Sequence, residues 1–448
     1  MDDSTVALDS PLARDRLAAL TDLVANQGVG LASPEAGEML KINLHAHTIY
    51  SYSGYGYSPS RLAWLALRQG WYALGTVDFD VLDGVEETLT ACDICGIRGA
   101  AGLETRTWMP DRLDDVFNSP GEPGVMYYVA MGFAGRQPHS TVAATLESLR
   151  ERAQARNREM VRLVNAYLDP VVVDYTRDVV PLTPCGNATE RHILVAYDAA
   201  ARRHFPARED LLGFWAERLG LERAAVGAFL GEDPFPHDAI RSKLMKQGGP
   251  GYMLPGPGSF PALDEIVDAT QACGALPCYA FLDGTNRGEQ DMASQLEYLI
   301  ERGIVALVVI PERNWNVSDA GHAQELVQRL HQALDVAQAM DFPVFIGTEM
   351  NKPGQRQIDD LSVPALRAYA RQFQQGADML YAHTALARTG GLGYHSEWAR
   401  AELPSRAQRA RFYGEIGRHM RPADGSIARA ASVMQSAGPR AALRALCQ

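Results

Sequence analysis

The sequence has few cysteines, no excess of basic residues and no long apolar run. Its 6 cysteines among 448 residues are too few for a disulfide framework. Acidic residues outnumber basic ones by 54 to 42, for a formal net charge of −12, whereas nucleic-acid binders usually present a basic face. No stretch approaches the roughly 18 consecutive apolar residues that span a bilayer. We therefore expect no nucleic-acid partner and no membrane partner.

The remaining composition is that of a large globular protein. Hydrophobic residues make up 46% of the chain and charged residues 21%. The acidic start MDDSTVALDS does not resemble a signal peptide, so we expect a cytoplasmic protein. The length exceeds what one ordinary core needs, which favours a large α/β domain with insertions or two joined domains. The oligomeric state stays open, a homo-oligomer included.

Short apolar runs alternate with helical patterns along much of the chain. Strands are expected at 41–44, 73–77, 97–103, 125–133, 276–282, 303–310, 342–347 and 377–383. Ser58, Pro59 and Gly70 mark the start and end of the first helix between them. This order predicts about seven or eight parallel strands, and a closed barrel is the simplest way to bury strands that are apolar on both faces.

Residues 139–247 interrupt this alternation with long helical patterns, and the Gly/Pro-rich run GGPGYMLPGPGSFP (248–261) predicts a long ordered loop. Five segments are expected. They are a helical lead (1–40), a first barrel half (41–138), a helical insertion with the Gly/Pro loop that caps the substrate (139–262), a second barrel half (263–395) and a helical C-terminal tail (396–448).

His45 and His47 stand one residue apart at the end of the first expected strand. Side chains two positions apart on a strand point the same way, so both imidazoles should converge where barrel active sites are built. Imidazole is a common ligand of zinc-class metals. An isolated His-x-His is more often a pair of hydrogen-bonded loop histidines, so the motif alone leaves both readings open.

Acidic and amide side chains follow other expected strands at the same position. They are Asp78 and Asp80 in GTVDFD, Glu104 in GAAGLETR, and Glu349 and Asn351 in IGTEMN. Converging carboxylates repel each other unless a cation lies among them. The repeated position therefore favours a metal site.

The series NLHAHTIYS, VDFDVLDGVEE, GLE and GTEMN resembles the polymerase and histidinol phosphatase (PHP) family of metal-dependent phosphoesterases. The resemblance covers roughly residues 41–135 and 265–355. It implies a distorted (β/α)₇-type barrel, with up to three metal ions at the C-terminal ends of the strands. Together with the patterns above, the expected fold is an α/β barrel of this type with a helical insertion and a helical C-terminal cap.

Several positions depart from the family pattern. The family usually has Asp where this chain has Tyr52, and His where it has Phe79. Histidines are also usual near Tyr127 and Phe281, and the closing Gly-Ser-Asp-x-His appears here as GTEMN. Because phenylalanine cannot coordinate an ion, the resemblance implies fewer metal ions than its relatives hold.

By this subtraction, a single divalent ion is expected. Its implied ligands are His45, His47, Glu104 and Glu349. Zinc, manganese and iron all accept such ligands, so the identity stays open. The candidate catalytic residues beside it are Asp78, Asp80 and Arg106, the two aspartates as proton carriers.

The substrate is expected to be a small anionic or polyhydroxylated molecule. Candidate substrate-binding residues are Tyr52, Arg191, Lys243, Arg313, Asn351 and His383, and His383 could instead restore a metal ligand. The fork of arginine suits carboxylate or phosphate, although salt bridges or a solvated helix face would explain the same basic residues.

A single metal ion disfavours phosphoryl transfer, for which two- and three-ion sites clamp the attacking and leaving oxygens. Hydrolysis by a metal-activated water is the favoured function. One alternative is a metal-assisted lyase or isomerase acting on a sugar-acid-like compound. Another is a non-catalytic descendant of the family that binds a ligand.

Overall fold

The computed structural model describes residues 3–27, 39–135 and 141–447. Part of the expected N-terminal lead, 28–38, and the expected boundary at 138/139 lie outside these ranges. No helix in the described ranges is both long enough and apolar enough to span a membrane.

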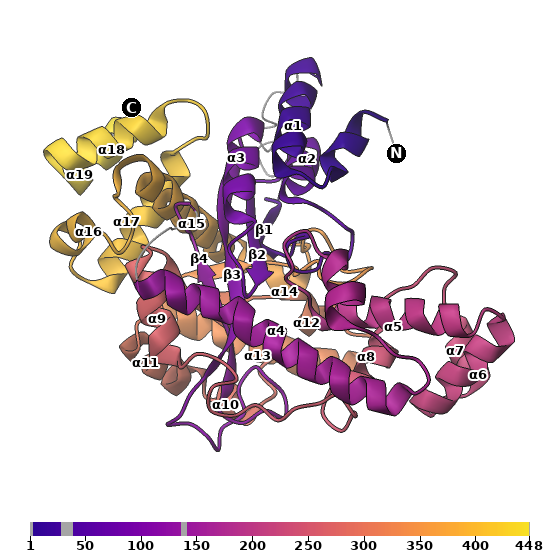
Figure 1. Cartoon of the computed structure of the whole chain (residues 1–448). Helices are drawn as coiled ribbons and strands as arrows, with labels where there is room; N and C mark the ends of the chain where they lie inside the picture. Colours follow the sequence, from indigo (N-terminus) through magenta and orange to yellow (C-terminus); the bar gives the residue numbers. More distant parts are fainter. Residues whose placement is uncertain (1–2, 28–38, 136–140, 448) are drawn as a thin grey trace.

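The described residues form one sheet of seven strands in the order β1 to β7 (Figure 1). The strands are β1 (Ile42–Ala46), β2 (Ala73–Phe79), β3 (Arg98–Trp108), β4 (Val125–Met131), β5 (Leu276–Phe281), β6 (Ala306–Val309) and β7 (Val344–Ile346). The sheet nearly closes, because the His47 N–H donates to the Glu349 carbonyl at 2.7 Å and the Glu349 N–H donates to the His45 carbonyl at 2.8 Å. The predicted fold class, a distorted α/β barrel with helical additions, is confirmed.

The strands are apolar on both faces because helices cover the outside and side chains fill the inside. Where two strands approach closely, only glycine fits. A Cβ at Gly102 in β3 would lie 1.9 Å from the Ala130 carbonyl oxygen of β4, a distance that no side chain allows.

The expectation that all strands are parallel is wrong, because β4 runs antiparallel to both β3 and β5. Parallel neighbours need a long crossover, usually a helix. The segment between β3 and β4 contains neither helix nor strand, so the chain turns back and pairs antiparallel.

The strand predicted at 377–383 is also wrong. These residues lie inside α15 (Ala370–Gly390), which is buried along Gly376–Leu386. The sequence of a helix that is buried on all sides is a continuous apolar run. Over only a few residues, such a run cannot be distinguished from a strand.

Helices of the lead and the barrel surround the sheet. They are η1 (Asp3–Asp9), α1 (Ala13–Gln27), α2 (Pro59–Gln69), α3 (Val85–Cys95), α9 (Leu263–Ala272), α10 (Arg287–Gln290), α11 (Met292–Glu301), α12 (Glu312–Trp315), α13 (Ala320–Ala339), α14 (Pro364–Arg367) and α15. The predicted caps of α2 are confirmed, since Ser58 accepts from the Arg61 N–H and Gly70 adopts a left-handed conformation.

The helical insertion follows β4 and builds a hydrophobic cluster of its own around Val164, Tyr197 and Trp215. Its elements are α4 (Thr141–Leu168), η2 (Tyr175–Val179), η3 (Val180–Leu182), α5 (Glu190–His204), α6 (Arg208–Leu219), α7 (Arg223–Phe229) and α8 (Asp238–Met245). Figure 1 shows α4 crossing in front of the sheet, with α5, α6 and α7 extending away from it. The segment 248–261 contains neither helix nor strand, as predicted.

The C-terminal part is helical, as predicted, and packs beside α15 (Figure 1). Its helices are α16 (Glu397–Glu402), α17 (Arg406–His419), α18 (Ser426–Ala437) and α19 (Pro439–Leu446). A Cβ at Gly417 in α17 would lie 1.9 Å from the Asp378 carbonyl oxygen, so α17 and α15 touch backbone to backbone.

Candidate active site and metal centre

Three buried side chains from β1, the residue after it and β3 converge at the mouth of the barrel. His45 is the last residue but one of β1, His47 directly follows that strand, and Glu104 lies in β3; their exposed fractions are 2%, 0% and 7%. His45 Nε2 lies 2.9 Å from Glu104 Oε2 in a hydrogen bond, and His47 Nε2 lies 3.2 Å from the same oxygen without hydrogen-bond geometry. Burial raises the pKa of Glu104, but the two imidazoles outweigh it and hold that pKa well below its usual range.

The donor atoms of this cluster suit a divalent ion. One ligand atom from each of the three residues lies within 4.8 Å of the others. Their contacts are close to the separation of about 3.3 Å between two ligands of a tetrahedral zinc ion with bonds about 2.0 Å long. His47 Nε2, which faces Glu104, is buried and has no hydrogen-bond partner among the described residues, so it is available to a metal ion. On His45 the nitrogen that faces Glu104 is Nε2, and the other ring nitrogen, Nδ1, is buried without a partner among these residues. The cluster could therefore hold a metal ion.

His47 is oriented by a chain of hydrogen bonds behind it. Ser51 Oγ lies 3.2 Å from His47 Nδ1 and donates to Asp78 Oδ1 at 2.6 Å. Because the hydroxyl proton goes to Asp78, Ser51 accepts from Nδ1–H, which leaves a lone pair on Nε2 facing Glu104. Phe79 stacks on the imidazole at 4.2 Å between centroids.

Asp78, predicted as a proton carrier, lies in this supporting position. It is 2% exposed, it also accepts from the Thr48 N–H and hydroxyl, and it does not line the cavity. Burial raises the pKa of Asp78, an effect that His47 and these hydrogen bonds oppose. Its contacts suit the orientation of His47 better than proton transfer to a substrate.

Asp80 lines the cavity and adopts a left-handed conformation with φ 60°, which is uncommon outside glycine. Its carboxylate accepts from the Thr105 hydroxyl at 2.5 Å and lies 3.5 Å from Arg156 Nη2. Burial raises the pKa of Asp80, with Arg156 opposing the shift. This position and direction of shift suit a group that holds and delivers a proton.

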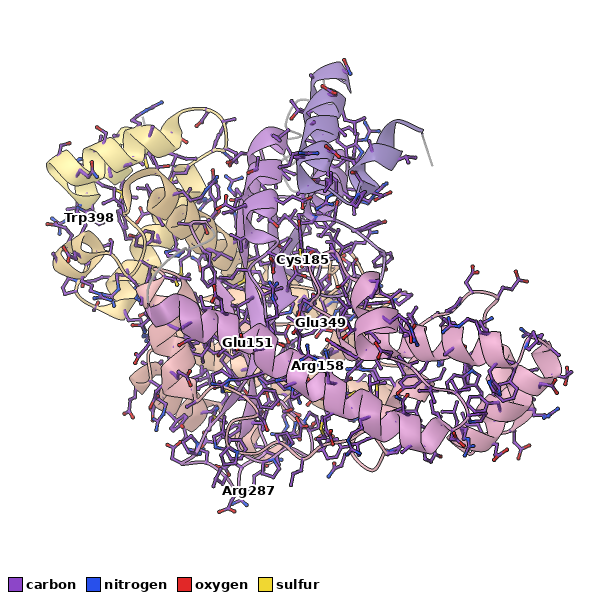
Figure 2. The ribbon with its side chains drawn as sticks, viewed as in Figure 1. Glu151, Arg158, Cys185, Arg287, Glu349 and Trp398 are labelled. Atoms are coloured by element: carbon purple, nitrogen blue, oxygen red, sulfur yellow. The ribbon has the colours of Figure 1, made fainter. Side chains whose placement is uncertain are left out.

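Glu349 lies outside the three-residue cluster, in the middle of the molecule (Figure 2). Glu349 and Met350 both have positive φ, 63° and 56°. Arg313 and Gln355 donate to the Glu349 carboxylate, at 2.5 and 3.1 Å. Burial raises its pKa and Arg313 then lowers it, with a net shift below the usual value. Its role as a fourth ligand stays a prediction.

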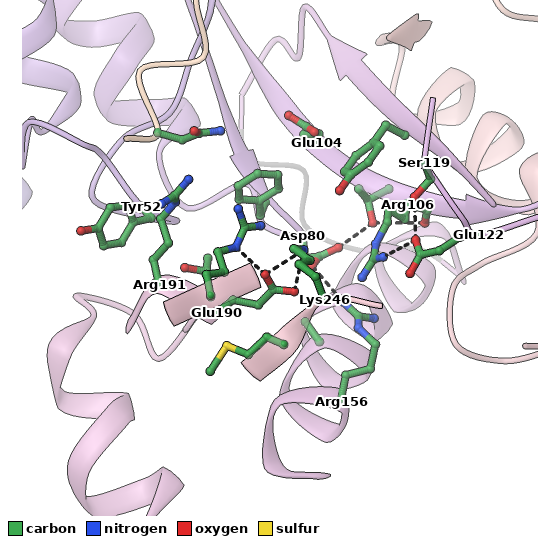
Figure 3. A pocket seen from close by; sticks show the side chains of 18 of the residues that line it. Tyr52, Asp80, Glu104, Arg106, Ser119, Glu122, Arg156, Glu190, Arg191 and Lys246 are labelled. Carbon is green, nitrogen blue, oxygen red and sulfur yellow. Dashed lines mark hydrogen bonds and ion pairs between the residues drawn. The ribbon is translucent and has the colours of Figure 1, made fainter. Parts of the chain in front are cut away.

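A cavity of about 770 Å³ opens in front of the cluster, between the barrel and the insertion (Figure 3). The insertion is anchored over the mouth by Asn187, which donates to the Phe79 and Tyr50 carbonyls, and by an ion pair between Arg150 and Asp83. The sequence-predicted residues that line this cavity are His45, Tyr52, Asp80, Glu104, Arg106, Arg191, Arg313, Glu349 and Asn351.

Lys243 and His383 are not among the lining residues. Lys243 is exposed on α8, whereas Arg241 and Lys246 reach the cavity from another face of that segment. His383 is fully buried in α15, where Nε2 lies 3.0 Å from the Gly132 carbonyl and Nδ1 accepts from the Tyr394 N–H at 2.9 Å. These contacts give His383 a structural position away from the site.

Several cavity residues were missed in the sequence. They are Glu122, Arg156, Glu190 and Phe260. Glu190 pairs with Arg241 at 2.6 Å and Lys246 at 2.9 Å. Burial raises the pKa of Glu190, but these two cations lower it to about 2. A signal existed for Arg156, because Ala153, Arg156 and Met160 are spaced to share one face of α4, so a charged residue lies between two apolar residues of that face.

No family model matches the chain, and no curated protein matches it significantly. Six chains of known structure are similar to this one, and two bacterial proteins are among them. An amidohydrolase from Chromobacterium violaceum, with bound sulfate and no metal, shares 16% identity over 74% of this chain and 96% of its own, with a TM-score of 0.46. A protein assigned as a metal-dependent phosphoesterase from Bifidobacterium adolescentis shares 18% identity over 76% of this chain and 98% of its own, also with a TM-score of 0.46. At these identities and TM-scores, neither similarity indicates the activity of this chain.

Proposed function

We propose that this chain is a metal-dependent hydrolase that acts on a small anionic or polyhydroxylated metabolite. The observation that carries the proposal is the buried cluster of His45, His47 and Glu104 at the mouth of the barrel, next to the cavity. Catalytic zinc sites commonly use three protein ligands and keep one position for water or substrate. When bound, a divalent ion supplies a water molecule with a pKa of about 7.

Residues of the chain itself would transfer a proton and bind the substrate. Asp80 faces the cavity and is suited to deliver a proton to the leaving group, because its pKa is raised. Arg106 and Arg313 line the cavity and can bind negative charge on the substrate. Tyr52 is placed to contact the substrate beside Arg191, whose guanidinium lies 5.8 Å from the centre of its ring.

The proposal is tested with a panel of carboxylate-bearing esters and amides and of phosphate monoesters. Turnover should disappear after chelation, return with zinc, manganese or iron, and fall by at least about 100-fold in Asp80→Asn, which keeps the shape but cannot exchange the proton. Products formed in ¹⁸O-labelled water should carry the label. Turnover without the label would favour the lyase alternative, and turnover that survives chelation would contradict a metal-dependent enzyme.

A further inference from the structure

Two arginines from distant parts of the chain share one aromatic ring in the cavity. The guanidinium carbon of Arg106, on β3, lies 4.3 Å from the centre of the Phe260 ring, and that of Arg156, on α4, lies 4.6 Å from it. Phe260 ends the Gly/Pro-rich segment and is only 3% exposed. The Ser259 carbonyl also accepts from Arg156 Nη1 at 3.0 Å, so this segment fixes the position of the second arginine.

Both guanidinium groups remain accessible to a ligand. Their side chains are 22% and 23% exposed, and both line the cavity. Among the described residues, Arg106 makes one side-chain hydrogen bond, from Nη1 to Glu122 Oε2 at 2.8 Å. A guanidinium has five N–H donors, so most of those on Arg106 have no partner among the described residues.

Basic side chains slightly outnumber acidic ones around the cavity, and Figure 3 shows several of both kinds together. The seven lining lysines and arginines are Arg106, Arg156, Arg191, Arg241, Lys246, Arg313 and Lys352, and the six lining acidic residues are Asp80, Glu104, Glu122, Glu190, Asp238 and Glu349. Burial lowers the pKa of Arg156, Asp80 opposes that shift, and the like charge of Arg106 adds to it, because two guanidinium groups beside one ring repel each other. An anion between them would relieve this repulsion.

We propose that Arg106 and Arg156, aligned by Phe260, form an anion subsite that binds a carboxylate or phosphate group of the substrate. The subsite rests on the proposed hydrolase, because it would hold the end of the substrate that does not react. Glu104 and Arg106 lie two positions apart on one face of β3, about 7 Å along the strand. The anionic group would therefore be several bonds away from the bond that breaks.

Anion binding by metal-free protein tests this subsite separately from metal chemistry. Inorganic phosphate and succinate are titrated calorimetrically at low ionic strength into wild type, Arg156→Gln, Arg106→Gln, Phe260→Leu and Arg158→Gln. Arg158 provides the matched control, because it lies on α4 (Figure 2), is exposed and does not line the cavity. Circular dichroism checks that each variant is folded.

We expect wild type to bind at least one of the two anions, which identifies the preferred group. Arg156→Gln and Arg106→Gln should each weaken binding by about tenfold or more, because a charge-assisted hydrogen bond is lost. Phe260→Leu should weaken it without any change of charge, and Arg158→Gln should leave it unchanged.

The proposal is overturned if wild type binds neither anion at millimolar concentration, or if folded Arg156→Gln or Phe260→Leu binds as wild type does. It is also overturned if Arg158→Gln weakens binding as much as Arg156→Gln, because the effect would then reflect overall charge. If wild type binds no metal ion, that result contradicts the proposed metal-dependent hydrolase but not the anion subsite.

Discussion

The hydroxyl of Ser51 links His47 to Asp78, so its removal tests how the metal centre is held. In Ser51→Ala, His47 Nδ1 loses its acceptor, and the tautomer that keeps Nε2 free is no longer fixed. Loss of such a supporting partner typically lowers metal affinity by about 10- to 100-fold, or about 1.4 to 2.7 kcal/mol.

The fold should survive this change. Asp78 keeps two hydrogen bonds from Thr48, at 2.9 and 2.7 Å, so its carboxylate stays paired. The expected loss of unfolding free energy is about 1 to 2 kcal/mol for the missing hydrogen bonds. The metal-binding effect can therefore be measured on folded protein.

The assay is a competition titration of zinc between the protein and a chromophoric chelator. Ser53→Ala is the matched control, since Ser53 lies in the same loop and accepts from the Tyr55 and Tyr57 N–H groups without contacting His47. Ser51→Ala should bind zinc at least about tenfold more weakly than Ser53→Ala. Equal affinities in the two variants would refute the proposed orientation of His47.

Three further predictions concern stability. Glu87→Gln should cost about 3 to 5 kcal/mol in urea unfolding, because Glu87 and Arg16 form an ion pair that is 1–2% exposed; a cost below about 1 kcal/mol would contradict this. Glu190→Gln should cost about 2 to 3 kcal/mol at pH 7, since the folded-state pKa of Glu190 is lowered to about 2. That difference should shrink as pH falls from about 4.5 through 2, because the carboxylate becomes protonated in both states only below the folded-state pKa, and a constant difference would refute the linkage. Gly376→Ala should lower the melting temperature, because its Cβ would lie 1.9 Å from the Val344 carbonyl oxygen, whereas Gly414→Ala, with 3.5 Å to the nearest atom, should raise it.

Strand geometry made part of the site predictable. His45 and His47 share a direction because of the two-residue period of a strand, and Glu104 reaches them because β3 finishes at the same end of the barrel as β1. The two-residue period is a local property of a strand, and the common strand end follows from the barrel fold. The convergence of these three residues could therefore be predicted from the sequence.

The opposite wall of the cavity was not predictable in the same way. Arg156, Glu190 and Phe260 belong to the insertion and its loop, and their positions depend on how those segments pack against the barrel mouth. Lys243 was predicted to bind the substrate, but Lys246 lines the cavity instead, because the sequence of this segment does not fix which of its faces turns inward. For α15, burial on all sides along Gly376–Leu386 removed the periodic pattern that distinguishes a helix from a strand.

The central claim is a single divalent ion held by His45, His47 and Glu104. The most direct measurement is the metal stoichiometry of the protein after exposure to zinc, manganese or iron and removal of free ions. We expect one equivalent in wild type and in the exposed-histidine control His322→Ala, and close to none in His47→Ala and Glu104→Gln. No bound metal in wild type, or a full equivalent retained by Glu104→Gln, would contradict the account.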